Sequence, residues 1–92
     1  MKKSPRIVFM GSPDFAAIAL KRLAQDFNVV GAVTQPDRRG GRGKKLISPP
    51  VKILADELYI PTIQPRRVRD EESMDALRRF APDLIVVAAY GQ

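Results

Sequence analysis

Short apolar runs alternate with amphipathic segments along this chain of 92 residues. The apolar runs show no regular alternation of apolar and polar positions, which is typical of strands buried on both faces of a parallel sheet. Four runs predict strands at residues 6–10, 29–34, 62–63 and 84–89. Between these strands, apolar residues recur at helical spacing and predict three helices, which follow Ser12, Ser48 and Asp70.

Polar residues and prolines mark the predicted ends of these helices. Ser12 and Ser48 each precede a proline, and a serine cap followed by proline is a favoured way to begin a helix. Asp70 is the predicted cap of the third helix, which has two glutamates in its first turn and two arginines in its last turn. These charges complement the helix dipole at both ends, and Pro82 ends the helix.

Alternating strands and helices predict an α/β fold with a parallel sheet of about four strands and helices on both faces. Right-handed crossovers then give one half of a doubly wound, Rossmann-like fold. In such folds, ligands bind beyond the carboxyl ends of the strands, and three informative segments of this chain lie there. The predicted rim of a substrate pocket consists of Gly11, Ser12, Asp14, Tyr90, Gly91 and Gln92.

Each of these rim positions also has a purely structural interpretation. The turn at Gly11 resembles a phosphate cradle, but it has one glycine and lacks the dinucleotide fingerprint, and Asp14 would repel a phosphate. A simple strand-to-helix turn is therefore the favoured interpretation. Tyr90 either closes over a ligand or packs half-buried at the end of a strand.

The amino-acid composition limits the catalytic and metal-binding functions that this chain can have. The 45% hydrophobic content is that of a globular protein, and the chain contains neither cysteine nor histidine. It therefore has no disulfide, no thiolate and no imidazole, so we expect no metal site. No nucleophile–base pair is apparent, and no catalytic residue is assigned. The apolar runs are too short to span a bilayer and no signal peptide precedes them, so we expect a cytoplasmic protein.

A basic segment from Gln35 to Lys45 carries most of the net charge of +6. It combines one carboxylate, that of Asp37, with the cationic side chains of Arg38, Arg39, Arg42, Lys44 and Lys45. We expect residues 35–47 to be irregular, because no periodic pattern crosses them. A glycine-rich basic arm favours phosphate backbones of nucleic acid, with a solvated surface loop as the alternative.

Two smaller features remain open at this stage. Asp37 is a candidate catalytic acid, but an aspartate after proline more often caps a turn. A second arginine cluster consists of Arg66, Arg67 and Arg69. This cluster either extends the basic surface or pairs with Glu71 and Glu72, and pairing is the favoured interpretation.

Several long motifs, in order and in register, resemble the N-terminal part of the methionyl-tRNA formyltransferase family. They are the segments GSPDF at 11–15, VTQPDR at 33–38, GRGKKL at 41–46, PVK at 50–52 and PDLIVVAAYGQ at 82–92. The resemblance covers the chain from Arg6 to Gln92 and implies a truncated formyltransferase N-terminal domain of the Rossmann type.

The resemblance also implies an enzyme of translation initiation and protein biosynthesis. Members transfer a formyl group from 10-formyltetrahydrofolate, as co-substrate, to the α-amino group of methionine on initiator tRNA. The basic segment matches the family's insertion that reaches the tRNA acceptor end, so Arg38, Arg42, Lys44 and Lys45 are implied tRNA contacts. Arg39-Gly40 replaces the Pro-Ala that is more common there, and Arg39 adds a further charge.

The family's catalytic Asn, His and Asp and its Ser-Leu-Leu-Pro folate segment follow a point equivalent to Gln92. We therefore interpret residues 1–92 as an incomplete catalytic domain, inactive alone, without the C-terminal tRNA-binding domain of the family. The resemblance also implies a monomeric parent protein, with Tyr90, Gly91 and Gln92 as the first edge of a folate pocket. The alternatives are a sugar-nucleotide formyltransferase and a non-catalytic RNA-binding module.

Overall fold

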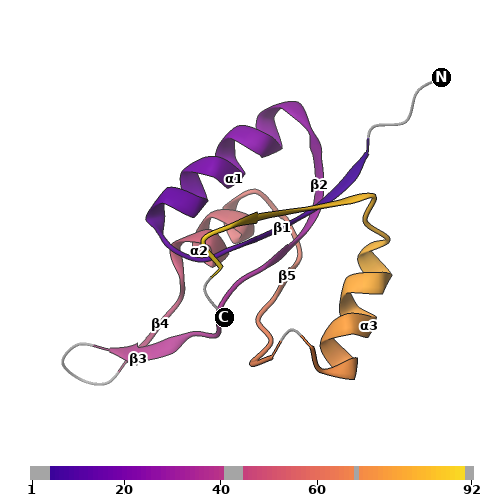
Figure 1. The fold of residues 1–92 in the computed structure, drawn as a ribbon. Helices are drawn as coiled ribbons and strands as arrows, with labels where there is room; N and C mark the ends of the chain where they lie inside the picture. Colours follow the sequence, from indigo (N-terminus) through magenta and orange to yellow (C-terminus); the bar gives the residue numbers. More distant parts are fainter. Residues whose placement is uncertain (1–4, 41–44, 68, 91–92) are drawn as a thin grey trace.

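The structure is a computed structural model that describes residues 5–40, 45–67 and 69–90. Its main sheet has four strands in the order β5-β2-β1-β6, and every pair of neighbours is parallel. The strands are β1 (Arg6–Gly11), β2 (Asn28–Val33), β5 (Thr62–Ile63) and β6 (Leu84–Ala88). The predicted α/β class and parallel sheet are therefore confirmed (Figure 1).

Three helices connect these strands: α1 (Asp14–Asp26), α2 (Pro50–Glu57) and α3 (Glu71–Phe80). Neighbouring residues of β1 point to opposite faces of the sheet and so belong to different cores. Phe9 packs in a core with α1 and α2, whereas Val8 packs in a second core with Leu77 of α3. Around β1 the sheet is thus covered on both faces, as the uninterrupted apolar strands predicted.

The helices begin slightly later than their sequence signals indicated. Pro13 and Pro49 occupy the cap positions of α1 and α2, and neither helix has a side-chain cap hydrogen bond. Asp70 is the cap residue of α3, but its side chain forms no cap hydrogen bond either. The prediction that Ser12 caps a helix was wrong, because its hydroxyl accepts a hydrogen bond from the backbone of Gln35 (2.9 Å).

The basic segment also differs from its prediction. Within the range 35–47 that was expected to be irregular, residues 38–40 and 45–47 form two antiparallel strands, β3 (Arg38–Gly40) and β4 (Lys45–Ile47). We call this pair the basic hairpin. It forms a two-stranded sheet of its own and projects from the molecule (Figure 1). Because the described side chains of both strands are mostly exposed, no apolar alternation signals these strands in the sequence.

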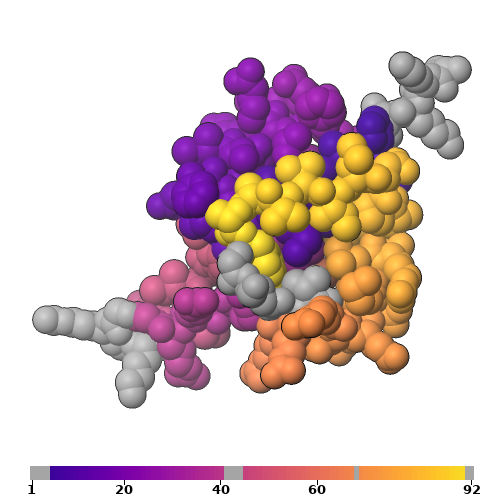
Figure 2. Space-filling model, in the orientation of Figure 1, coloured from indigo at the N-terminus to yellow at the C-terminus, as the bar shows by residue number. Residues whose placement is uncertain are grey.

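The strand β6 lies at one edge of the main sheet, where Figure 2 shows it across the front of the molecule in yellow. Its side chains at Leu84, Ile85 and Val87 are exposed. Across the described ranges, no helix has the length and apolar character needed to cross a membrane.

Candidate functional site

A pocket of about 410 Å³ lies at the carboxyl ends of the strands, where the basic hairpin leaves the body of the protein. It is lined by residues that follow β1, β2 and β6 and by residues of the hairpin and the segment after it. These are Ser12, Pro13, Gln35, Pro36, Arg38, Arg39, Gly40, Ile47, Ser48, Pro49, Pro50, Ala89 and Tyr90. Three segments distant in sequence thus meet at one rim.

The predicted rim residues have different positions. Ser12 and Tyr90 line the pocket, whereas Gly11 and Asp14 are not among its lining residues. Gly11 is buried at the end of β1, where an added Cβ would lie 2.5 Å from the carbonyl oxygen of Ala88. Its role in the fold is therefore close packing between strands, while Asp14 is exposed in the first turn of α1. Gly91 and Gln92 lie outside the described residues.

Gln35 joins the ends of three strands. Its backbone N–H donates to the hydroxyl of Ser12 after β1 (2.9 Å), and its side-chain amide donates to the carbonyl of Tyr90 after β6 (2.8 Å). Gln35 itself follows β2. No role was predicted for Gln35 from the sequence, although its position directly beyond a strand is the signal that could have identified it.

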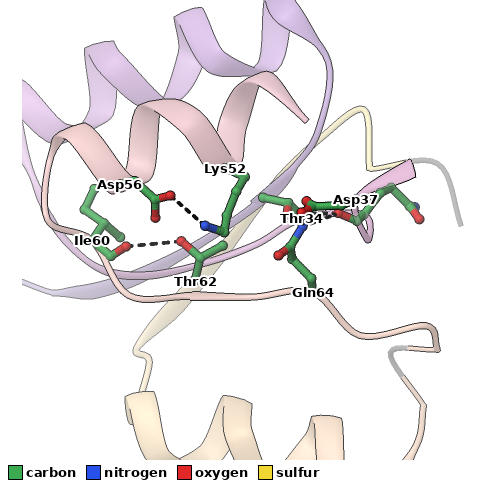
Figure 3. A network of polar contacts seen from close by, with 8 residues as sticks. Thr34, Asp37, Lys52, Asp56, Ile60, Thr62 and Gln64 are labelled. Atoms are coloured by element: carbon green, nitrogen blue, oxygen red, sulfur yellow. Dashed lines mark hydrogen bonds and ion pairs between the residues drawn. The ribbon is translucent and has the colours of Figure 1, made fainter. Parts of the chain in front are cut away.

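Gln64, which follows β5, connects the fourth strand to the same rim. Its side-chain amide donates to the carboxylate of Asp37 (2.6 Å) and to the carbonyl of Gln35 (3.1 Å), as Figure 3 shows for the Asp37 contact. Sequence reasoning missed Gln64, because its partner Asp37 is 27 residues away. A hydrogen-bonded network therefore spans the ends of all four strands of the main sheet.

Asp37 is the acidic member of this network. Hydrogen bonding to Gln64 and then Ser48 holds the pKa of its carboxyl below the ordinary value, against an opposing effect of burial and with a smaller contribution from the charge of Lys52. Lys52 itself is paired with Asp56 (2.6 Å; Figure 3). Asp37 thus accepts hydrogen bonds from side chains across the rim, an arrangement that holds structure and does not by itself indicate catalysis.

Three of the predicted nucleic-acid contacts, Arg38, Arg39 and Lys45, lie on the strands of the basic hairpin. Arg38, Arg39 and Lys45 are exposed, and the first two also line the pocket. Arg42 and Lys44 lie outside the described residues. Because the exposed guanidinium groups of Arg38 and Arg39 border the pocket, a polyanion bound along the hairpin would pass directly beside the rim.

Tyr90 combines a buried ring with an unsatisfied hydroxyl. Its ring packs against Val8, Val33 and Leu77, and the residue is 7% exposed. Within the described part of the chain its hydroxyl has no hydrogen-bond partner, and burial raises the pKa of that phenol. The ring therefore belongs to the core beneath α3 and is more deeply buried than the half-buried packing considered from the sequence.

Arg66 of the arginine cluster borders a second pocket of about 390 Å³, together with Asp70 and Glu72. The mixed charges there indicate a locally balanced surface rather than an extension of the basic hairpin. Among the described residues, no group of three or more acidic, histidine or cysteine side chains could hold a metal ion.

The fold and the rim define this protein as a Rossmann-like α/β protein with a pocket at the carboxyl edge of its sheet. A sequence model of the formyl transferase family matches residues 5–92, so the chain belongs to the formyl transferase family.

Curated relatives agree with this assignment. The chain is 58% identical over 92 residues to a methionyl-tRNA formyltransferase of Desulfotalea psychrophila, covering 99% of this chain and 28% of the relative. It is 57% identical over 88 residues to one of Geobacter sulfurreducens, and 49% identical over 88 residues to one of Thermotoga sp.; each comparison covers 95% of this chain and 28% of the relative. The chain thus spans a little over a quarter of the length of these relatives.

Proposed function

We propose that this chain is the N-terminal part of the catalytic domain of a methionyl-tRNA formyltransferase. The complete enzyme would transfer the formyl group of 10-formyltetrahydrofolate to the α-amino group of methionine on initiator tRNA. It would act in the cytoplasm as a monomer, with a further tRNA-binding domain beyond these residues. The named relatives support this proposal through the identity that they share over 99% and 95% of the chain.

One structural observation carries the proposal furthest: the basic hairpin stands beside the rim pocket. A small sugar-nucleotide acceptor needs no cluster of cations outside the pocket, whereas a tRNA acceptor end presents phosphates there. Arg38 and Arg39 belong to both features, because they are exposed on the hairpin and also line the pocket. This geometry suits a substrate that is held by its backbone and reacts at its end.

Formyl transfer needs catalytic groups and a correctly positioned substrate, and we assign these two tasks to different parts of the enzyme. An amine attacks a formyl carbonyl, so the site must stabilise a developing oxyanion and remove a proton from nitrogen. The 92 residues contain no histidine, and we assign those tasks to the Asn, His and Asp that the family resemblance implies further along. This part positions the substrate, a contribution that acts through orientation.

The sharpest test is a chimaeric enzyme in which this chain replaces the matching residues of the Desulfotalea psychrophila relative. Labelled 10-formyltetrahydrofolate is supplied together with initiator Met-tRNA and a UDP-amino-sugar as competing acceptors. We expect the label on the tRNA, and we expect the 92-residue chain alone to transfer none. Circular dichroism and a cooperative thermal transition establish that the chimaera is folded.

Other outcomes would reject the proposal in different ways. Label on the amino sugar would indicate a sugar-nucleotide formyltransferase. A folded chimaera that binds tRNA without transferring label would indicate that this chain serves an RNA-binding module. A matched chimaera in which Lys21→Gln and Arg22→Gln remove two exposed charges of α1, distant in sequence from the hairpin, should remain active.

A further inference from the structure

The orientation of the basic hairpin depends on what holds its base. The strands β3 and β4 pair with each other and with no strand of the main sheet. The hairpin is therefore attached to the body through two short segments, 35–37 before β3 and 48–50 after β4. We call these two segments the hairpin base. The orientation of the hairpin relative to the main sheet therefore depends on the conformation of its base.

The carboxylate of Asp37 ties the hairpin base together. It accepts a hydrogen bond from Gln64, at the end of β5 (2.6 Å), and the side chain of Ser48, in the opposite segment of the base, helps to lower its pKa. Gln64 also donates to the carbonyl of Gln35 in the first segment (3.1 Å). One carboxylate and one amide thereby connect the first segment of the base, from which β3 continues, to the rim of the main sheet.

We propose that Asp37 and Gln64 are positioning residues that fix the direction of the basic hairpin relative to the rim pocket and so align a bound polynucleotide with it. The inference rests on the proposed function for the identity of the polynucleotide, but the geometry of the base stands independently of it. Neither residue needs to touch the substrate, because both act through the hairpin.

A rotation at the hairpin base would displace the far end of the hairpin. From Asp37 to Gly40 the first strand extends about 10 Å, so a rotation of about 20° at the base would displace its far end by about 3 Å. A displacement of this size exceeds the tolerance of a hydrogen bond between arginine and phosphate.

The first measurement tests the direction of the hairpin without any assay of activity. The chain has no cysteine, so Leu46→Cys in β4 and Arg22→Cys in α1 provide two unique positions for spin labels. Both side chains are exposed. We expect a narrow distribution of label distances with Asp37 present, a broad one in Asp37→Ala, and a narrow one again in Asp37→Asn, because asparagine retains an acceptor for Gln64.

The second measurement uses the chimaeric enzyme described above. Asp37→Ala should raise KM for Met-tRNA about tenfold and leave kcat within about twofold, because an interaction that only positions the substrate is lost. Asp37→Asn should restore most of the affinity. Asp75→Ala is the matched control: Asp75 also accepts a short bond (2.7 Å, from Arg78), but on α3 and away from the hairpin base. If Asp37→Ala does not fold, Gln64→Met removes the opposite partner.

Each outcome decides a separate question. Equal distance distributions in all variants would overturn the assignment of Asp37 and Gln64. A broadened distribution with unchanged KM would also overturn their positioning role, because the direction of the hairpin would then be irrelevant to the substrate. A folded but inactive unsubstituted chimaera would instead reject the proposed function, and the label distances would still decide whether the base fixes the hairpin.

Discussion

At the scale of single residues, the hydroxyl of Tyr90 is an unusual feature, since it is buried without a partner in the described part of the chain. An unsatisfied buried polar group costs about 1–3 kcal/mol. We therefore expect Tyr90→Phe to raise the free energy of unfolding by about 1 kcal/mol, measured by urea denaturation at neutral pH. An unchanged or lower value would show that the hydroxyl has a partner in solution.

The same residue gives a prediction for alkaline pH. Burial raises the pKa of Tyr90 above its ordinary value of 10.0, so the folded chain holds this proton more tightly than the unfolded chain. Its contribution to stability is complete below pH 10 and is lost as the pH rises through the folded-state pKa. Thermal melting between pH 9 and about pH 11 should therefore show a steeper loss of stability for the unsubstituted chain than for Tyr90→Phe. Parallel curves would contradict this prediction.

Asp37 gives the opposite dependence at acid pH. Its folded-state pKa is lowered, first by the hydrogen bond from Gln64, so its contribution is present above the unfolded-state pKa and is lost as the pH falls through the folded-state value. We expect the melting temperature of the unsubstituted chain to exceed that of Asp37→Asn at pH 7, and the difference to close as the pH falls below about 4. A difference that is constant with pH would exclude a role for the charge.

At the scale of elements, the end of β1 is the most crowded junction of the fold. A Cβ at Gly11 would lie 2.5 Å from the carbonyl oxygen of Ala88 and 2.9 Å from the Cβ of Ala16. Because these are backbone and first side-chain atoms, they cannot move aside without shifting β6 or α1. We expect Gly11→Ala to lower the free energy of unfolding by about 3 kcal/mol or more, measured by chemical denaturation.

A matched glycine in the basic hairpin serves as the control for this substitution. At Gly40 the nearest atom to an added Cβ is the terminal methyl of Ile47, 3.0 Å away, at the end of a flexible and exposed side chain. We expect Gly40→Ala to change stability by less than about 1 kcal/mol. If the two substitutions cost the same, close packing is not the reason for glycine at position 11.

The elements that could be predicted from the sequence are those with a strong local pattern. The two-residue strand Thr62–Ile63 and the helix Glu71–Phe80 were predicted closely, because prolines and charges border them. Strands β3 and β4 were missed, since strands with mostly exposed side chains lack the apolar signal. The base of the hairpin was missed for another reason: the contact between Asp37 and Gln64 depends on the sheet bringing together residues that are distant in sequence.

The candidate site was predictable in its location but not in its connections. Parallel strands place their carboxyl ends at one edge, so the meeting of Ser12, Gln35 and Tyr90 follows from the topology alone. The hydrogen bonds of Gln35 and Gln64 follow from side-chain directions that no periodicity encodes. The assignment of individual residues to substrate contacts remains a prediction.

At the scale of the whole molecule, the distribution of charge matters more than its net value of +6. Two exposed arginines, Arg38 and Arg39, lie on the hairpin beside the pocket, whereas Lys21 and Arg22 lie on α1. Removing either pair of charges gives a variant with a net charge of +4. Comparing the two variants therefore tests whether the position of the positive charges determines RNA binding. The first replaces both hairpin arginines with glutamine, and the second replaces the two cations of α1.

Binding of each variant to a hairpin RNA that reproduces a tRNA acceptor stem is measured between 50 and about 200 mM salt. Each phosphate contact contributes about 0.9 to the slope of log K against log salt for B-form duplexes, so loss of the hairpin arginines should flatten the slope by up to about 2. The α1 variant should retain the slope of the unsubstituted chain, because charges that do not contact phosphates release no counterions on binding. Equal flattening in both variants would mean that the RNA responds to net charge alone, and the hairpin would then have no privileged role as its binding surface.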